Sequence, residues 1–235
     1  FLPKLEEGKD PGERYLAINA DESEPGTFKD RLLMDFDPHL MLEGIAITCY
    51  ACQLDVAYIY IRGEYHHQAM VVEQAIKEAY EQGVFGGSGL LKGASTALGG
   101  PFKVECHLHR GAGAYICGEE TGLLESLEGK RGWPRIKPPF PAIKGLFGRP
   151  TTINTVETMA PLPSIIERGA DWFKTMGTPG AGGPPSFGTK LMGVSGHVNR
   201  PGVYEFDLGI PLSTLVNEHC QGMRDGKKFK GAIAG

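Results

Sequence analysis

Two polar loops hold the residues of this sequence whose types and spacing could carry out chemistry. Residues 19–26 read NADESEPG and residues 111–121 read GAGAYICGEET. Each loop follows a run of strand-like residues and holds carboxylates with amides or glycines. Polar loops at strand ends are where α/β proteins bind ligands, and glycines let a backbone approach a flat or phosphorylated ligand closely. The sequence therefore predicts a cofactor-binding protein.

The side chains of the first loop suit the edge of a heteroaromatic ring. Asn19 and Asp21 could hydrogen-bond such an edge, while Glu24 could bind a carboxamide or a ribose hydroxyl. The alternative is a solvated acidic turn. Because the turn is sharpened by Pro25 and Gly26 and comes directly after a strand, we favour a binding loop.

The second loop combines a Gly-x-Gly, Tyr115 and the pair Glu119-Glu120 at the start of a predicted helix. Alone, the Gly-x-Gly is weak evidence, because it is not the six-residue dinucleotide fingerprint. The glutamates also have a simpler explanation, since acidic residues interact favourably with a helix N-terminus. Tyr115 can equally be a core residue or a ligand contact.

A basic and aromatic segment, residues 130–149, follows the second loop. It holds no acidic residue, and Trp133, Phe140 and Phe147 lie among its basic residues. The six basic residues are Lys130, Arg131, Arg135, Lys137, Lys144 and Arg149. This pattern suits the phosphates and base of a nucleotide, a single-stranded nucleic acid, or a solvated basic face. The net charge of −4 favours a small nucleotide over nucleic acid.

The cysteines and histidines do not complete a predicted metal site. Cys49 and Cys52 lie in an apolar predicted helix without a second pair, so we interpret them as core thiols. His107 and His109 share one face of a predicted strand, and we interpret them as structural histidines. The odd total of five cysteines indicates reduced thiols rather than disulfides.

The elements that must position the loops alternate between strand and helix periodicity. Asp37-Pro38 predicts a helix start, and Gly83 predicts a helix end. Strands are predicted at residues 15–18, 56–62 and 102–109, and helices at residues 40–54, 68–82 and 119–127. This alternation predicts βαβ units and an α/β fold with a mostly parallel sheet.

The regular alternation of strands and helices ends at a run rich in glycine and proline, residues 177–185. Strands are predicted at residues 190–194 and 203–206, and a helix at residues 211–219. We therefore predict a first domain over 1–176, a linker over 177–188 and part of a second domain over 189–235. Since the chain opens on Phe1 and stops after an apolar stretch, we expect a fragment. No transmembrane or signal segment is predicted.

Six segments, in this order, make the chain similar to the flavin-binding 51 kDa (F) component of respiratory NADH dehydrogenase, complex I, and to its relatives in NAD-linked hydrogenases and formate dehydrogenases. They are NADESEPG (19–26), KDR (29–31), RGEY (62–65), GAGAYICGEET (111–121), KPPFPA (137–142) and PTTINTVET (150–158). The resemblance implies an NADH dehydrogenase that transfers a hydride from NADH to FMN, with electrons passing singly to iron–sulfur clusters that feed quinone reduction.

The resemblance also implies roles for single residues. Those implied to surround FMN are Asn19, Asp21, Glu22, Tyr115, Gly118, Glu119 and Asn154. Glu24 and Glu120 are implied to meet the nicotinamide end of NADH as positioning groups at the catalytic centre, and Phe140 and Phe1 to contact the adenine. Thr155 stands where the bacterial pattern commonly has a second asparagine, so it is only a further candidate.

The implied fold is a Rossmann-like, three-layer FMN-binding domain followed by the start of a ubiquitin-like β-grasp (SLBB) domain. The family's glycine-rich GRGGAGFP loop, which cradles the FMN phosphate, is expected just before Phe1. The family's C-terminal helical domain, which binds a [4Fe–4S] cluster, is not in this sequence, so no cluster ligation by this chain is expected.

The implied partners are other subunits of a redox complex, first of all a [2Fe–2S] subunit of the 24 kDa type. The implied location is the cytoplasmic or matrix side, in the peripheral arm of a membrane-bound complex and without direct membrane contact. An alternative is a hydrogenase, formate dehydrogenase or Rnf-type electron-transfer subunit. The GEE and NADESEPG motifs favour NADH oxidation over an Rnf-type subunit. A third alternative is single-stranded nucleic-acid binding through residues 130–149, which predicts an affinity that depends strongly on salt.

Overall fold

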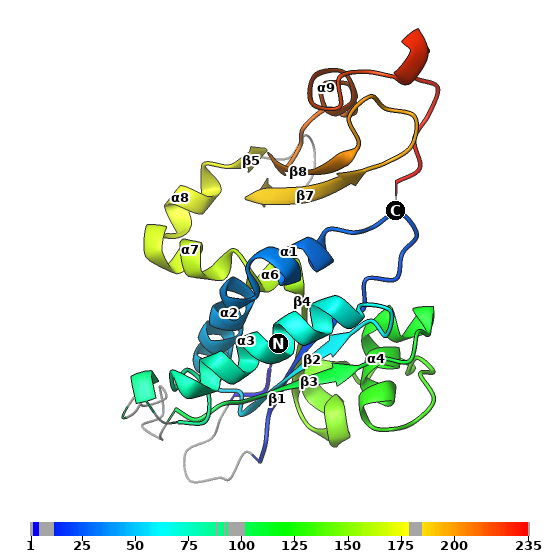
Figure 1. Ribbon diagram of the computed structural model, residues 1–235. Coiled ribbons are helices and arrows are strands. Elements are labelled where there is room, and N and C mark those ends of the chain that lie inside the picture. Colours follow the sequence, from blue (N-terminus) through cyan, green and yellow to red (C-terminus); the bar gives the residue numbers. More distant parts are fainter. Residues whose placement is uncertain are drawn as a thin grey trace. The chain divides into compact units, whose positions relative to one another are not determined.

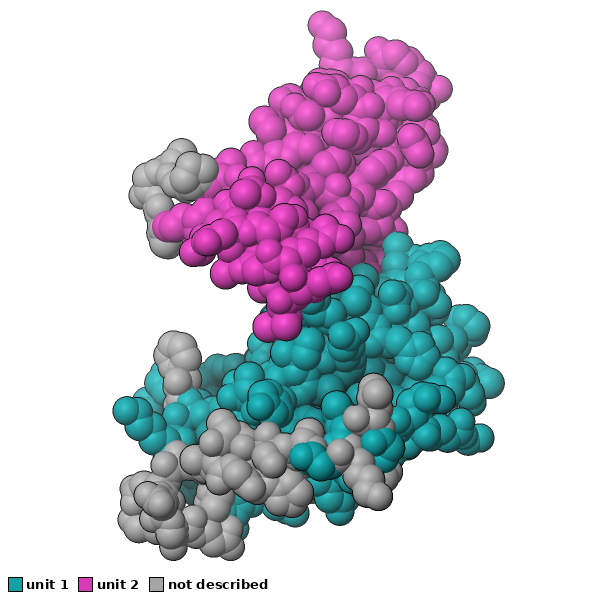
Figure 2. Space-filling view, turned by 90° about the vertical axis from the view of Figure 1, so that its left-hand side faces the viewer, with its two compact units in different colours: residues 1–23, 30–163 teal, residues 24–29, 164–235 magenta. Residues whose placement is uncertain are grey.

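The computed structural model describes residues 2–4, 12–87, 89–91, 93, 102–178 and 185–234 (Figure 1). Phe1 lies outside these described residues. The chain divides into two compact units, Phe1–Ser23 with Asp30–Pro163 and Glu24–Lys29 with Ser164–Gly235 (Figure 2). We describe each unit by itself.

The first unit is built on a four-stranded parallel sheet with the order β3-β2-β1-β4. Its strands are β1 (Tyr15–Ala20), β2 (Val56–Ile61), β3 (Glu105–Arg110) and β4 (Thr151–Thr155). The register places Asn19 opposite Tyr60 and Thr155. The carboxyl ends of the central strands therefore meet at one edge of the sheet. The predicted parallel sheet is confirmed, although β3 begins three residues later than expected, and periodicity alone did not predict β4.

Helices cover both faces of this sheet, which makes three layers (Figure 1). Leu16 and Ile18 of β1 pack into one core, while Tyr15 and Ala17 pack into the other, as the alternation of side chains along a strand requires. The first core is shared with α1 (Asp30–Phe36), α2 (Pro38–Cys52), α3 (His66–Glu81) and α6 (Val156–Met159). The second is shared with α4 (Glu120–Leu127) and the short 3₁₀ helix η3 (Leu146–Gly148).

The expected helix ends of the first unit are confirmed. The Asp37 carboxylate accepts a hydrogen bond from the backbone N–H of Leu40 at 3.1 Å, with Pro38 in the first turn of α2. Gly83, which follows α3, has a φ of 75°, a conformation that favours glycine. The remaining short elements of this unit are η1 (Gly89–Leu91), η2 (Tyr115–Gly118) and α5 (Pro141–Lys144).

The second unit has a different construction, with antiparallel pairs and a small core. Its strand pairs are β5 (Gly177–Thr178) with β6 (Ser186–Phe187) and β7 (Thr189–Val194) with β8 (Gly202–Asp207). Its helical turns are α8 (Ala170–Lys174), α9 (Leu212–Thr214), the π-helix η4 (Leu215–His219) and η5 (Arg224–Gly226). Helix α7 (Leu162–Arg168) begins in the first unit. The core consists of Val198, Leu215, Val216 and Cys220.

Strands β7 and β8 and the helical turns after Pro211 agree with the predicted elements. Strands β5 and β6 lie within the predicted linker, and the exact domain boundaries stay a prediction. Among the described residues, no helix combines the length and the apolar character that a bilayer span requires.

Candidate functional site

The two polar loops predicted from the sequence meet at the carboxyl edge of the parallel sheet. The side-chain amide of Asn19, at the end of β1, donates to the carbonyl of Gly118 at 2.8 Å. Its Oδ1 accepts from the backbone N–H of Asp21 at 3.1 Å. A Cβ added to Gly118 would lie 3.1 Å from the Asp21 carbonyl, so a larger residue would require the backbone at Asp21 to shift by a few tenths of an ångström. One amide therefore joins segments that are 99 residues apart in the sequence.

The turn after β2 packs against the second loop through glycines. A Cβ on Gly63 would lie 2.4 Å from the Gly111 carbonyl. Gly113 has a φ of +84°, and a Cβ there would lie 3.1 Å from Glu64 Oε1. A side chain at position 63 would separate the two backbones, and position 113 has a φ that favours glycine, so the glycines permit the close approach of two strand ends. The RGEY motif thus belongs to the same edge as the two polar loops.

Glu22 is buried in the first loop, with only 6% of its surface exposed. Its carboxylate accepts from the backbone N–H groups of Asp30 at 2.9 Å and Arg31 at 3.2 Å, at the start of α1. The Tyr65 hydroxyl donates to the same carboxylate at 3.0 Å. Burial and the neighbouring Glu22 raise the pKa of Tyr65 to about 12. Glu22 therefore fixes the shape of the first loop from inside the protein.

Asp21 is also buried, at 8% exposure, and accepts a hydrogen bond from the Ser23 hydroxyl. Burial raises the pKa of the Asp21 carboxyl, and the Ser23 hydrogen bond and the Arg62 charge only partly oppose that rise. The Arg62 guanidinium donates to the Glu22 carbonyl at 3.2 Å and lies 3.2 Å from Glu64. The first loop thus keeps a desolvated carboxyl group beside the Asn19 amide.

Glu119 caps α4 at the end of the second loop. Its Oε2 accepts from the backbone N–H groups of Thr121 and Gly122, each at 2.8 Å, and from the Thr121 hydroxyl at 2.6 Å. Burial alone raises the pKa of Glu119, but these hydrogen bonds and the charge of Lys137 outweigh it, and the pKa is lowered. The predicted helix start at this residue is confirmed, and the carboxylate is ionised at neutral pH.

Glu120 faces the basic segment rather than its own loop. The ammonium of Lys137 hydrogen-bonds Glu120 and lies 3.5 Å from Glu119 Oε1. The side chains of Glu120 and Lys137 remain 41% and 30% exposed. The Glu120 hydrogen bond is the main reason that the pKa of Lys137 is raised. A carboxylate and an ammonium group therefore lie together at the open rim of the site.

The remaining candidates occupy different places. Tyr115 is 60% exposed in η2, so its alternative interpretation as a core residue is wrong. Phe140 is 59% exposed directly before α5. Asn154 and Thr155 lie on β4 beside β1, and the Thr155 hydroxyl accepts from the Thr158 N–H at 3.3 Å at the start of α6. Glu24 belongs to the second unit, so its position relative to these residues is not described.

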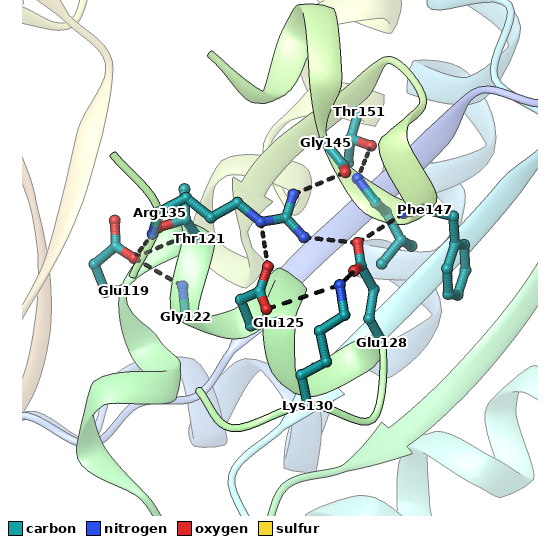
Figure 3. Close-up of polar contacts among 11 residues, drawn as sticks. Glu119, Thr121, Gly122, Glu125, Glu128, Lys130, Arg135, Gly145, Phe147 and Thr151 are labelled. Carbon is teal, nitrogen blue, oxygen red and sulfur yellow. Dashed lines mark hydrogen bonds and ion pairs between the residues drawn. The ribbon is translucent and has the colours of Figure 1, made fainter. Parts of the chain in front are cut away.

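The basic segment is not the open cationic patch that its composition suggested (Figure 3). Arg135 binds Glu125 at 2.5 Å and Glu128 at 2.6 Å, and Lys130 binds Glu128 at 2.6 Å. With Lys137 engaged by Glu120, half of the six basic residues are neutralised by carboxylates of α4 and its cap. These carboxylates lie outside residues 130–149, so the composition of the segment by itself does not show the pairing. Nucleotide binding by this segment stays a prediction.

The histidines of β3 pack on aromatic rings of β2. His107 lies 5.5 Å from the Tyr58 ring, and His109 stacks on Tyr60 at 5.2 Å. Burial lowers the pKa of His109, as the structural interpretation requires. All five cysteines are free thiols, and within the described ranges no group of three or more His, Cys, Asp or Glu residues could hold a metal ion.

A family model described as the Nuo51 FMN-binding domain matches residues 1–164. The chain belongs to this family. A model of the SLBB domain matches residues 191–235. The resemblance inferred from six motifs, and the fold that it implied, are thereby confirmed.

Curated relatives and a solved structure agree with this assignment. The chain is 50% identical over its whole length to "NADH dehydrogenase [ubiquinone] flavoprotein 1, mitochondrial" of Dictyostelium discoideum, covering 46% of that protein. It is 51% identical over its whole length to an F-type component of the NADH-quinone oxidoreductase of Rhizobium meliloti, covering 52% of it. The chain therefore spans about half the length of these relatives. A chain of the NAD⁺-reducing [NiFe]-hydrogenase is 39% identical, with a TM-score of 0.76, over 91% of this chain and 33% of that one.

Proposed function

We propose that this chain forms the FMN- and NADH-binding part of an NADH dehydrogenase flavoprotein subunit of complex I. The observation that carries the proposal is the Asn19–Gly118 hydrogen bond, which joins the two polar loops in a chain of the Nuo51 FMN-binding family. Bound FMN would supply the redox chemistry, accepting a hydride from NADH and passing electrons on singly. The protein supplies binding, orientation and charge.

The residues at the sheet edge fit a flavin. The close approach of Gly63 to Gly111 and of Gly118 to Asp21 leaves bare backbone at the strand ends, which suits the face of a planar ligand. The Asn19 amide has two N–H donors, and its hydrogen bond to the Gly118 carbonyl uses one of them. Together, Asn19 and Asp21 can meet the donors and acceptors along the edge of a heteroaromatic ring.

The carboxylates divide into two proposed roles. Glu22 and Glu119 act as internal caps that keep the loops in place, because their oxygens accept backbone N–H groups. Glu120 is proposed to accept a hydrogen bond from the carboxamide of NADH and so to orient the nicotinamide. Its partly exposed carboxylate, already paired with the Lys137 ammonium, suits that role better than proton donation. Glu24 is proposed to act with it, and Tyr115, Asn154, Thr155, Phe140 and Phe1 keep the ligand contacts that the resemblance implies.

The assembly is proposed from the relatives. Their names describe components of NADH-quinone oxidoreductase and NADH dehydrogenase. We propose that this chain likewise belongs to a multisubunit peripheral arm, next to a [2Fe–2S] subunit of the 24 kDa type. The [4Fe–4S] cluster of the whole subunit would be bound by residues outside this chain.

A second candidate is the corresponding subunit of an NAD-dependent hydrogenase. The observation that favours it is the similarity to the NAD⁺-reducing [NiFe]-hydrogenase chain, which covers 91% of this chain. The higher identity to the complex I relatives, 50% against 39%, makes it the second choice. Both candidates share the flavin and nucleotide chemistry and differ in the electron carrier that follows.

An anaerobic visible spectrum of the chain with FMN, recorded before and after NADH is added, tests the proposal. We expect a bound-flavin spectrum that NADH bleaches. Gly118→Val should abolish flavin retention, because its side chain would enter the 3.1 Å contact with Asp21. Gly231→Val is the matched control, since a Cβ there meets nothing within 4 Å. A chain, extended at its amino end by the glycine-rich loop, that still retains no flavin would refute the proposal.

A further inference from the structure

The guanidinium of Arg135 joins the carboxylates of α4 and its C-terminal end in one polar network (Figure 3). Its Nε donates to Glu125 Oε1 at 2.5 Å, and its Nη2 donates to Glu128 Oε1 at 2.6 Å. Its Nη1 donates to the Gly145 carbonyl at 2.8 Å. The side chain is 23% exposed, and the backbone N–H of Arg135 donates to the Thr121 hydroxyl at 2.7 Å. Every nitrogen of this residue is therefore engaged.

These contacts close a loop of the chain at its base. Residues 136–144, here called the 136–144 loop, begin directly after Arg135, which binds the carboxylates of Glu125 and Glu128. They end directly before Gly145, whose carbonyl also binds Arg135. The guanidinium holds both ends, because Arg135 begins the excursion and Gly145 accepts its Nη1. The returning end is fixed to the sheet by the Leu146 N–H, which donates to Thr151 Oγ1 at 2.8 Å. The loop is thus attached to α4 through the Arg135 side chain and to β4 through the Leu146–Thr151 hydrogen bond.

The 136–144 loop carries two groups of the candidate site. Lys137 reaches back to Glu119 and Glu120 across the rim. Phe140 stands 59% exposed before α5, where its carbonyl accepts from the N–H groups of Ile143 at 2.9 Å and Lys144 at 3.0 Å. Lys137 and Phe140 lie two and five residues from Arg135 in the chain. Their positions relative to α4 therefore depend on how the loop base is held.

We propose that Arg135 is a positioning residue for nucleotide binding, which holds the 136–144 loop so that Phe140 faces the adenosine half of NADH. This inference rests on the proposed function. A loop held in its binding conformation before the ligand arrives loses less conformational entropy on binding. The role requires arginine, because only its planar fork can bind two carboxylates and a carbonyl at once.

The test compares two hydride donors, NADH and reduced nicotinamide mononucleotide, which lacks the adenosine half. Each is oxidised by the FMN-loaded chain with ferricyanide as electron acceptor. We expect Arg135→Gln to raise the KM for NADH about tenfold with little change in kcat. The kcat/KM for the mononucleotide should stay within about twofold of the wild type, because that donor lacks the adenosine half that Phe140 is proposed to face. Arg135→Lys should behave like Arg135→Gln.

Lys130→Gln is the matched control, since Lys130 binds Glu128 but does not bridge the loop ends. It should leave both donors within about twofold of the wild type. An equal loss with NADH and the mononucleotide in Arg135→Gln would show a general structural role and overturn the proposal. No loss with either donor would also overturn it.

Failure of the proposed function gives a different result. In that case the wild-type chain loaded with FMN oxidises neither donor. Amide hydrogen exchange over residues 136–144 then decides the role of Arg135 by itself. Faster exchange there in Arg135→Gln, with β1 unchanged, supports the loop-holding role, and unchanged exchange contradicts it.

Discussion

The two polar loops at the sheet edge, residues 19–23 and 111–121, follow one plan at different depths. Each gives one carboxylate to the start of a helix, Glu22 to α1 and Glu119 to α4. Glu22 is only 6% exposed, whereas the Glu119 and Glu120 side chains remain 32% and 41% exposed. Water can replace a lost hydrogen bond in the second loop but not in the first. The first loop is therefore the rigid, buried one. The second keeps a partly exposed carboxylate, Glu120, which we propose orients the nicotinamide.

Of the substitutions that test this difference between the loops, replacement of Glu22 is expected to cause the largest loss of stability. Glu22→Ala should lower the free energy of unfolding by about 3 kcal/mol, because three donors lose an acceptor in a place that water does not reach. Urea unfolding at neutral pH measures this loss. Glu22→Gln is the control, since it keeps one acceptor oxygen and should cost clearly less. A loss below that of Glu119→Ala would show that the burial difference does not matter.

Glu119→Ala should cost about 1.5 kcal/mol, the usual range for removing a helix N-cap. The cost is smaller than at Glu22 because the carboxylate is partly exposed and water can satisfy the Thr121 and Gly122 N–H groups. The same unfolding measurement checks it, with far-ultraviolet circular dichroism to follow helix content. Glu125→Ala does not serve as a control, because it breaks the Arg135 network. An unchanged stability would show that Glu119 is not an effective cap.

The pH dependence of stability should have opposite signs in the two loops. Burial raises the pKa of Asp21, so the stability that its neutral form contributes is lost as pH rises through its folded-state pKa. The free energy of unfolding of Asp21→Asn should therefore rise relative to that of the wild type as pH increases. The pKa of Glu119 is lowered, so its contribution is present above its unfolded pKa and is lost as pH falls through the folded value. The deficit of Glu119→Gln should accordingly shrink in acid.

Unfolding free energies measured from about pH 3 to about pH 7 on the wild type and both variants test this contrast. Parallel curves for all three proteins would contradict it. A deficit of Glu119→Gln that grows toward acid would reverse the sign assigned to that carboxyl.

The smallest effect on stability is expected at Glu120. Glu120→Gln removes a solvent-screened ion pair with Lys137, so the free energy of unfolding should hardly change. Its effect on binding should be larger, with the KM for NADH raised about tenfold and the Kd for FMN within about twofold. Spectroscopic FMN titration and steady-state kinetics measure the two constants. Equal losses in NADH and FMN binding would refute the proposed role of Glu120.

Much of the fold could be predicted because its signals are local. The apolar run at residues 15–18, the Asp37-Pro38 cap and Gly83 act through residues that are neighbours in the sequence. Strand β4 was missed by periodicity, because TTINT reads as polar even though Thr151 is buried. The short helix η2 was also missed, since Gly-rich loops carry no helical periodicity.

The roles of the charged residues could be predicted only in part. Glu119 was found at a helix start because its capping partners are two and three residues away. The sequence leaves Lys137 and Arg135 in a basic segment that suits a nucleotide, a nucleic acid or a solvated face, since their carboxylate partners lie 7 to 17 residues away and no spacing rule links them. The predicted helix at residues 119–127, which is rich in carboxylates and directly precedes the basic segment, was the available signal. Its periodicity does not show which of the carboxylates reach Arg135 and Lys137.

The sequence by itself determined the family, the parallel sheet and the two loops that bear the candidate site, because motifs and periodicity are written in consecutive residues. The tertiary structure alone decided that Asn19 holds Gly118, that Glu22 is an internal cap and that Arg135 closes the 136–144 loop. Those contacts join residues that only the packed sheet and α4 bring within hydrogen-bond distance. Whether a charged side chain is exposed or paired depends on its distance in space from a partner. A pattern of residue types along the sequence does not give that distance.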